Sequence, residues 1–167
     1  MVLLAPLLLL KPPALFAQVQ SLVASNTAFA LNLYQQLATN QGNLFLSPYS
    51  ISTCLAMTYD GARGQTEAQM SHVLGFDTNQ SQFASNFGQL QIELQASQQT
   101  NAIELDIANA LWTQIGFPFL PAFLQNASNH FQANINQADF ATQADAARTA
   151  INDWIAQQTQ NKITNML

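Results

Sequence analysis

The sequence is poor in charge. Only 8% of its 167 residues are Asp, Glu, Lys or Arg, and the formal net charge is −5. The four basic residues are Lys11, Arg63, Arg148 and Lys162, and no two of them are adjacent in the sequence. This scarcity argues against a surface that tracks nucleic-acid phosphates and against a polybasic membrane patch. Nearly half of the residues are hydrophobic, so the chain is long and apolar enough to build one core.

Cysteine pairs and catalytic motifs are also lacking. The single Cys54 cannot form an internal disulfide, and we expect it to be a small core residue on a buried helix. The sequence has no Gly-x-Ser-x-Gly elbow, no glycine-rich phosphate loop and no cysteine pair for zinc. His72 and His130 have no ligand-type neighbours and are expected at helix ends or on the surface, while Glu104 and Asp106 are expected on a solvated strand face. We therefore expect no enzyme activity, no metal and no cofactor.

An apolar run opens the chain. Residues 1–17 are too short to span a bilayer but suit a signal peptide that is cut after Ala17, although the only nearby cation, Lys11, follows the run. We expect a signal peptide, and hence secretion to the extracellular space. The competing interpretation is an apolar extension on a cytoplasmic protein.

Residues 43–75 carry the most informative local pattern. Residues 43–46 are expected to form a short apolar strand, after which Ser47 caps a helix and Pro48 occupies its first position. Gly61 should stop this helix, most of which is expected to be buried. The stripe at helical spacing consists of Ile51, Cys54, Leu55 and Thr58.

A second helix is expected directly after the turn at 61–64. Thr66 and Gln69 have the spacing of a capping box, and Gly75 should end the helix. Apolar periodicity predicts further helices over 21–39, 81–97, 121–130 and 144–158, and strands over 102–112 and 133–138.

Several of these segments together resemble one family. The sequence Asn-Leu-Phe-Leu-Ser-Pro-Tyr-Ser-Ile at 43–51, followed by Gly-Ala-Arg-Gly-Gln-Thr-Glu at 61–67, is similar to the amino-terminal signature of the serpins, a family of serine-protease inhibitors. Segments 26–37, 107–114 and 151–163 resemble the family in sequence and spacing, with Asn161 in place of a usual glycine. The residues that carry the family motif are Asn26, Phe29, Pro48, Gly61, Thr66, Asn109, Trp112 and Trp154.

The resemblance implies an α+β fold over residues 18–167. It would be the amino-terminal part of a serpin, with helices A–F, strands 6B, 2A and 1A, and a sheet A that is incomplete because strand 3A and the reactive loop would follow residue 167. In serpins the two serines that correspond to Ser47 and Ser50 belong to the shutter under sheet A, which controls loop insertion. Helix D of some serpins binds heparin through Lys and Arg, but residues 81–97 contain neither, so no heparin site is expected.

The implied function is inhibition of a serine protease, or of a cysteine protease, by cleavage and insertion of a reactive loop. Because that loop would lie outside these residues, the chain alone is expected not to inhibit. Two alternatives remain open: a non-inhibitory binding or storage protein on the serpin scaffold, and an independent helical binding module.

Overall fold

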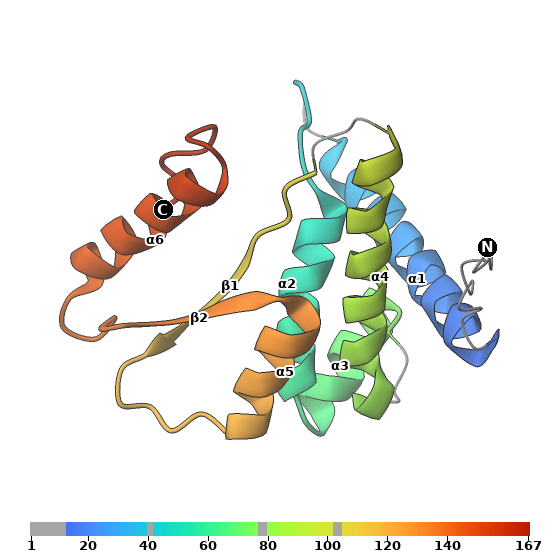
Figure 1. Cartoon of the computed structure of the whole chain (residues 1–167), viewed down its shortest axis with the longest axis horizontal. Coiled ribbons are helices and arrows are strands. Elements are labelled where there is room, and N and C mark those ends of the chain that lie inside the picture. The colour runs from blue at the N-terminus through green and yellow to red at the C-terminus, as the bar shows by residue number, and fades with distance from the viewer. Residues whose placement is uncertain (1–12, 40–41, 77–79, 102–104) are drawn as a thin grey trace, which may run out of the picture.

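The computed structural model describes residues 13–39, 42–76, 80–101 and 105–167. Over these residues, six helices and two strands follow one another (Figure 1). They are α1 (Pro13–Leu37), α2 (Pro48–Gly61), α3 (Gln65–Leu74), α4 (Gln80–Asn101), β1 (Asn109–Gln114), α5 (Pro121–Phe131), β2 (Ala133–Ala138) and α6 (Ala144–Gln158).

Helices α1 to α5 form a layer around an aromatic core. Tyr59 of α2 packs edge-on against Phe83 of α4, with ring centroids 4.8 Å apart, and Phe83 contacts Phe76 at 4.7 Å. Phe87 continues the chain of rings to Phe131 of α5 at 5.5 Å. Each such pair contributes about 0.5–1.5 kcal/mol beyond the burial of its area. The rings therefore tie α2, α4 and α5 into one unit.

The two strands pair in parallel, with Asn109 opposite Ala133 and Gln114 opposite Ala138. Helix α5 makes the crossover between them, as a parallel pair requires. Over the part of the chain that the structure describes, the sheet contains these two strands alone. Figure 1 shows α6 beyond the strands, away from the layer of helices.

Many of the predicted boundaries are confirmed. The strand over 133–138 and the helix over 144–158 have the predicted ends, and Gly61 is the last residue of α2. Gly75 ends α3 with a φ of 67°, and Asn161 adopts a φ of 61° at the position of the usual family glycine. The predicted stripe of α4 is also inside, because Phe83, Phe87 and Leu90 are buried and Leu94 packs against the core.

The predicted strand over 43–46 is wrong. These residues are irregular, Leu44 is exposed, and Phe45 is fully exposed. A short extended segment is not a strand without a partner, and none lies beside it among the residues described. The strand predicted over 102–112 begins only at Asn109, Leu105 is exposed, and residues 102–104, which include Glu104, lie outside the described residues.

The prediction for the buried side of α2 is also wrong. Cys54 is exposed, as are Ile51 and Thr58, and Leu55 is only partly buried. The buried side instead carries Ser52, Thr53, Ala56, Met57, Tyr59 and Asp60. Apolar spacing predicted the wrong buried face of α2. The hydroxyl residues Ser52 and Thr53 turn inward instead, because each finds a hydrogen-bond acceptor there.

Two helix starts differ from the predictions. Gly64 is the N-cap of α3 and no side chain caps it, so Thr66 lies within the first turn and the predicted capping box is wrong. Helix α1 begins at Pro13 rather than Ser21, and Val19 is buried in the core. The predicted cut after Ala17 would fall within α1, while residues 1–12 lie outside the described residues. The signal peptide therefore stays a prediction.

Candidate functional site

Ser47 and Ser50 occupy the start of α2. Ser47 is the N-cap, with φ −109° and ψ 97°, and its Oγ accepts a hydrogen bond from the backbone N–H of Ser50 at 3.3 Å. The Ser47 and Ser50 hydroxyls are 2.9 Å apart, and Pro48 begins the helix where no N–H donor is needed. The predicted cap is confirmed. Both serines are exposed, so their hydroxyls keep hydrogen-bonding capacity for another segment.

The start of α2 is fastened to α1 by a buried polar contact. The Oγ of Ser52 donates to Oδ1 of Asn26 at 2.5 Å, and Ser52 has no exposed surface. Phe29 packs against the same core one turn along α1. Tyr49, in the first turn of α2, is partly buried against the core, and burial raises the pKa of its phenol above the ordinary value of 10.0. The serines thus stand on a helix end that is fixed in position.

Asn109 fixes the start of β1. Its Nδ2 donates to the backbone carbonyl of Phe131 at 2.8 Å and to Oε1 of Gln91 at 3.4 Å. Gln91 is almost completely buried and donates in turn to Oε1 of Gln132 at 3.1 Å. Since Gln132 is the left-handed residue between α5 and β2, this network joins both strands to α4 and α5.

The carboxyl end of α2 packs against α5. A Cβ on Gly61 would lie 3.1 Å from the ring of Phe123, so the two helices approach closely here. Asp60 is buried, and both of its carboxylate oxygens accept hydrogen bonds from Nδ2 of Asn126, at 3.1 and 3.4 Å. A pocket beside Asp60 is lined by Met57 of α2 and Leu111 of β1, so α2 and β1 share one hollow.

Sequence reasoning assigned no role to three buried polar side chains that organise this region: Gln91, Asp60 and Asn152. Asn152 of α6 accepts hydrogen bonds from the N–H groups of Met166 and Leu167, at 3.0 and 3.1 Å, and donates to the carbonyl of Leu167 at 3.0 Å. Asn152 lies in the segment 151–163 that resembles the family, but that resemblance does not indicate its hydrogen-bond partners. The Asn152 side chain therefore holds residues 166 and 167 against α6.

The remaining motif residues do not converge on the two serines. Trp112 on β1 and Trp154 on α6 are both partly buried, and Thr66 is exposed on α3. His72 and His130 lie in the last turns of α3 and α5, as predicted. Among residues 13–39, 42–76, 80–101 and 105–167, no three His, Cys, Asp or Glu residues gather as a metal site would require.

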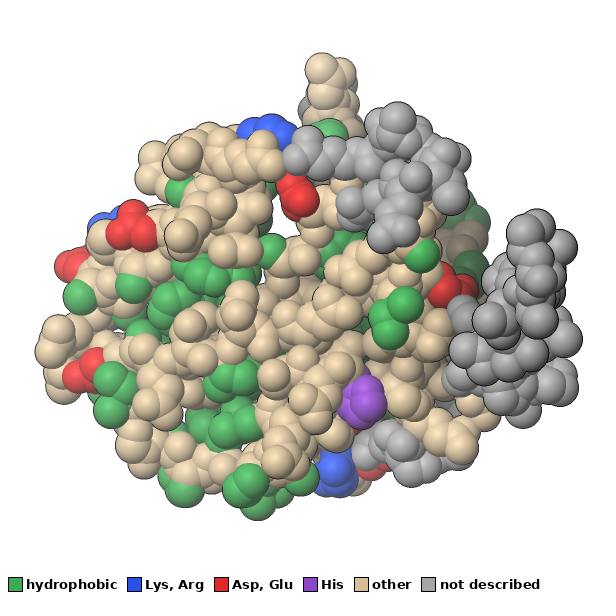
Figure 2. Space-filling view, in the orientation of Figure 1, with side chains coloured by type: hydrophobic (Ala, Val, Ile, Leu, Met, Phe, Trp, Pro, Cys, Tyr) green, Lys and Arg blue, Asp and Glu red, His purple; other side chains and the backbone are tan. Residues whose placement is uncertain are grey.

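Apolar side chains are exposed on α2 and around the two strands. Ile51 and Cys54 on α2 are exposed, as are Ile135 on β2 and Phe117 after β1. Figure 2 shows hydrophobic side chains in separate groups on the face turned to the viewer, with few charged side chains among them. An unpaired strand edge beside exposed apolar side chains can take up a further strand. None of the helices that the structure describes is both long and apolar enough to cross a membrane.

A family model described as "Serpin (serine protease inhibitor)" matches residues 24–167. This chain belongs to the serpin family. The leukocyte elastase inhibitor of Sus scrofa is 39% identical over 150 residues, an alignment that covers 89% of this chain and 39% of that protein. An uncharacterized serpin-like protein of Methanosarcina acetivorans is 33% identical over 150 residues, covering 87% of this chain and 35% of the relative.

Solved serpin structures share the fold. A cleaved serpin named Serpin 42Da superposes with a TM-score of 0.77 at 29% identity, over 90% of this chain and 39% of that one. The Arabidopsis serpin AtSerpin1, in its native stressed conformation, superposes with a TM-score of 0.76 at 27% identity, over 90% of this chain and 39% of that one. This serpin chain thus spans about two fifths of the length of these relatives. Its fold is α+β with an incomplete sheet, in which α1 to α6 are helices A to F, β1 is strand 2A and β2 is strand 1A.

Proposed function

We propose that this chain is the scaffold of a serine-protease inhibitor that works by loop insertion. The observation that carries the proposal is the short parallel sheet, which has an unpaired edge over the described residues and shares a pocket with α2. In the proposed reaction, the serine of a protease attacks a peptide carbonyl in an exposed loop and releases the downstream amine. The ester that remains joins protease to inhibitor, and the cleaved loop enters the sheet as a new strand.

The proposal assigns the switch to Ser47 and Ser50. Their hydroxyls are adjacent, exposed and mounted on a helix end that the Ser52–Asn26 contact fixes. Hydroxyl groups can donate and accept at once, so they can exchange partners as strands separate or close above them. We propose that their hydrogen bonds to the sheet set how readily the loop inserts.

The reactive loop is proposed to lie outside these 167 residues, because this chain covers only 39% of relatives such as the leukocyte elastase inhibitor. The chain alone is then expected not to inhibit any protease. Elastase is the first target to test, since the pig relative is named as its inhibitor. A cysteine protease is the second target to test.

A chimera tests the proposal. Residues 24–167 replace the aligned segment of the pig leukocyte elastase inhibitor, and the product is incubated with leukocyte elastase and run on a denaturing gel. We expect a detergent-stable complex of chimera and protease, as with the unmodified pig protein. A chimera that melts cooperatively but is only cleaved, without a complex, would contradict the proposal and favour a non-inhibitory binding or storage protein.

The role of the serines is tested in the same chimera. Ser50→Ala should change the ratio of trapped to merely cleaved inhibitor, whereas Ser128→Ala, on an exposed position of α5, should leave that ratio unchanged. Equal ratios for the two variants would exclude Ser50 from the switch while leaving the scaffold proposal intact. The 167-residue chain alone serves as the negative control.

A further inference from the structure

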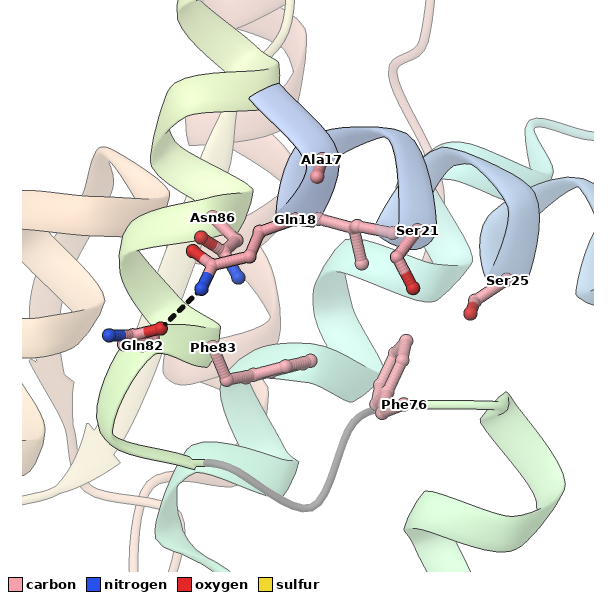
Figure 3. A pocket seen from close by; sticks show the side chains of 9 residues that line it. Ala17, Gln18, Ser21, Ser25, Phe76, Gln82, Phe83 and Asn86 are labelled. Atoms are coloured by element: carbon pink, nitrogen blue, oxygen red, sulfur yellow. Dashed lines mark hydrogen bonds between the residues drawn. The ribbon is translucent and has the colours of Figure 1, made fainter. Parts of the chain in front are cut away.

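A small pocket lies between the start of α1 and the start of α4 (Figure 3). Its volume is about 220 Å³. This volume is smaller than that of a site for a drug-sized ligand, but it has room for several water molecules. We call it the α1–α4 pocket. It is lined by Ala17, Gln18, Ser21, Leu22, Ser25, Phe76, Gln82, Phe83 and Asn86.

Among the described residues, the lining contains no charged side chain. Its polar groups are three amides and two hydroxyls, and its apolar floor includes the rings of Phe76 and Phe83 with centroids 4.7 Å apart. A charged ligand would lose its water without gaining an opposite charge, which is costly. The described lining therefore favours an uncharged molecule.

One buried polar atom in the lining has no hydrogen-bond partner among the described residues. Oδ1 of Asn86 is buried and accepts no hydrogen bond, whereas the neighbouring Gln18 donates from Nε2 to Oε1 of Gln82 at 2.6 Å. Figure 3 shows the Asn86 and Gln18 amides close together above the ring of Phe83. Buried acceptors in native proteins are normally satisfied, so this oxygen is open to a hydrogen bond from a molecule in the pocket.

We propose that the α1–α4 pocket binds a small uncharged polyhydroxylated molecule, a sugar ring or a polyol. Hydroxyl groups of such a ligand both donate and accept, as do the Ser21 and Ser25 hydroxyls and the amides of the rim. One ligand hydroxyl supplies the donor that Asn86 lacks. The C–H faces of the ligand lie on the aromatic floor, whose negative ring faces attract them. This site is independent of protease inhibition.

Ligand-observed NMR on the 167-residue chain tests the proposal with four probes: methyl glucoside, sorbitol, maltotriose and glucuronate. We expect saturation transfer to uncharged probes, with a dissociation constant on the order of 1 mM, and none to glucuronate. Transfer to methyl glucoside or sorbitol without maltotriose identifies a free small molecule. Transfer to maltotriose as well identifies the end of a glycan.

Two variants locate the binding. Ser21→Leu fills the pocket from an exposed position and should abolish transfer, whereas the matched Ser128→Leu on α5 should not. Asn86→Ala removes the unpartnered acceptor and should weaken binding three- to tenfold, which is the range of one hydrogen bond. Circular dichroism checks the folding of each variant, and Asn86→Ala carries the test if Ser21→Leu does not fold. The proposal is overturned if no uncharged probe binds, if glucuronate binds equally, or if the folded pocket variants bind as the unmodified chain does.

Discussion

Gly88→Ala should destabilise the chain although it improves the helix. Gly88 is buried in the middle of α4, and a Cβ there would lie 2.8 Å from the backbone oxygen of His130 and 3.3 Å from its Cα. Alanine favours a helix by about 1 kcal/mol over glycine. The obstruction is backbone of α5, so the two helices must separate, and the adjacent contact between Phe87 and Phe131 must stretch. Overpacking of this kind costs roughly 2–3 kcal/mol, which leaves a net loss of about 1–2 kcal/mol.

Urea unfolding followed by circular dichroism measures this loss, with Gly61→Ala as the matched control. A Cβ on Gly61 would meet only the ring of Phe123, at 3.1 Å, and a ring can move where backbone cannot. The control should therefore change the free energy of unfolding by less than about 0.5 kcal/mol. An increase in stability for Gly88→Ala, or equal losses for the two variants, would refute this account of the α4–α5 contact.

Three further predictions concern single side chains. Ser47→Ala removes the cap of α2 and should cost about 1 kcal/mol in a thermal or urea melt, and an unchanged melt would mean that the cap contributes nothing. Asn152→Ala removes the three hydrogen bonds to residues 166 and 167, so amide exchange at Met166 should accelerate severalfold, while the Ile163 amide, bonded to Thr159, should not change. Acceleration at both amides would indicate general loosening of the chain instead. Hydrogen bonds from Thr142 and Gln114 hold the pKa of Asp139 below its ordinary value of 3.8, so the stability it adds is fully present above pH 3.8 and is lost as the pH falls through the lower, folded pKa. An NMR titration of the Asp139 carboxyl that gave an ordinary pKa would contradict the hydrogen-bonded turn.

Local chemistry predicted the boundaries of the helices where a cap or a glycine decides them. Ser47, Pro48, Gly61 and Gly75 act within one turn of themselves, so the sequence alone identifies their roles. Gly64 is the exception. The predicted capping box is wrong because Gly64 is the N-cap and α3 begins at Gln65, so Thr66 is already inside the helix.

The direction in which α2 faces could not be read from its own residues. Cys54 and Ile51 have the spacing of a core stripe, but the core lies on the side of Ser52, whose partner Asn26 is 26 residues away. Phe45 is likewise apolar and fully exposed, because a strand needs a neighbour and no neighbour is present among the described residues. These outcomes depend on long-range contacts that periodicity does not encode.

Only the local part of the candidate site could be predicted from the sequence. The cap by Ser47 is local and was predicted, whereas the bonds of Asn109 to Phe131 and of Asn152 to Leu167 join segments that are far apart in the sequence. The family resemblance identified Asn109 as important without indicating its partner.

The most direct test of the scaffold proposal is the melting temperature of the elastase-inhibitor chimera before and after cleavage within its reactive loop. If the sheet that contains β1 and β2 accepts the cleaved loop, the new strand fills an open position and adds backbone hydrogen bonds. The account predicts that the cleaved chimera melts at a clearly higher temperature than the intact one. An equal or lower melting temperature after cleavage would contradict it.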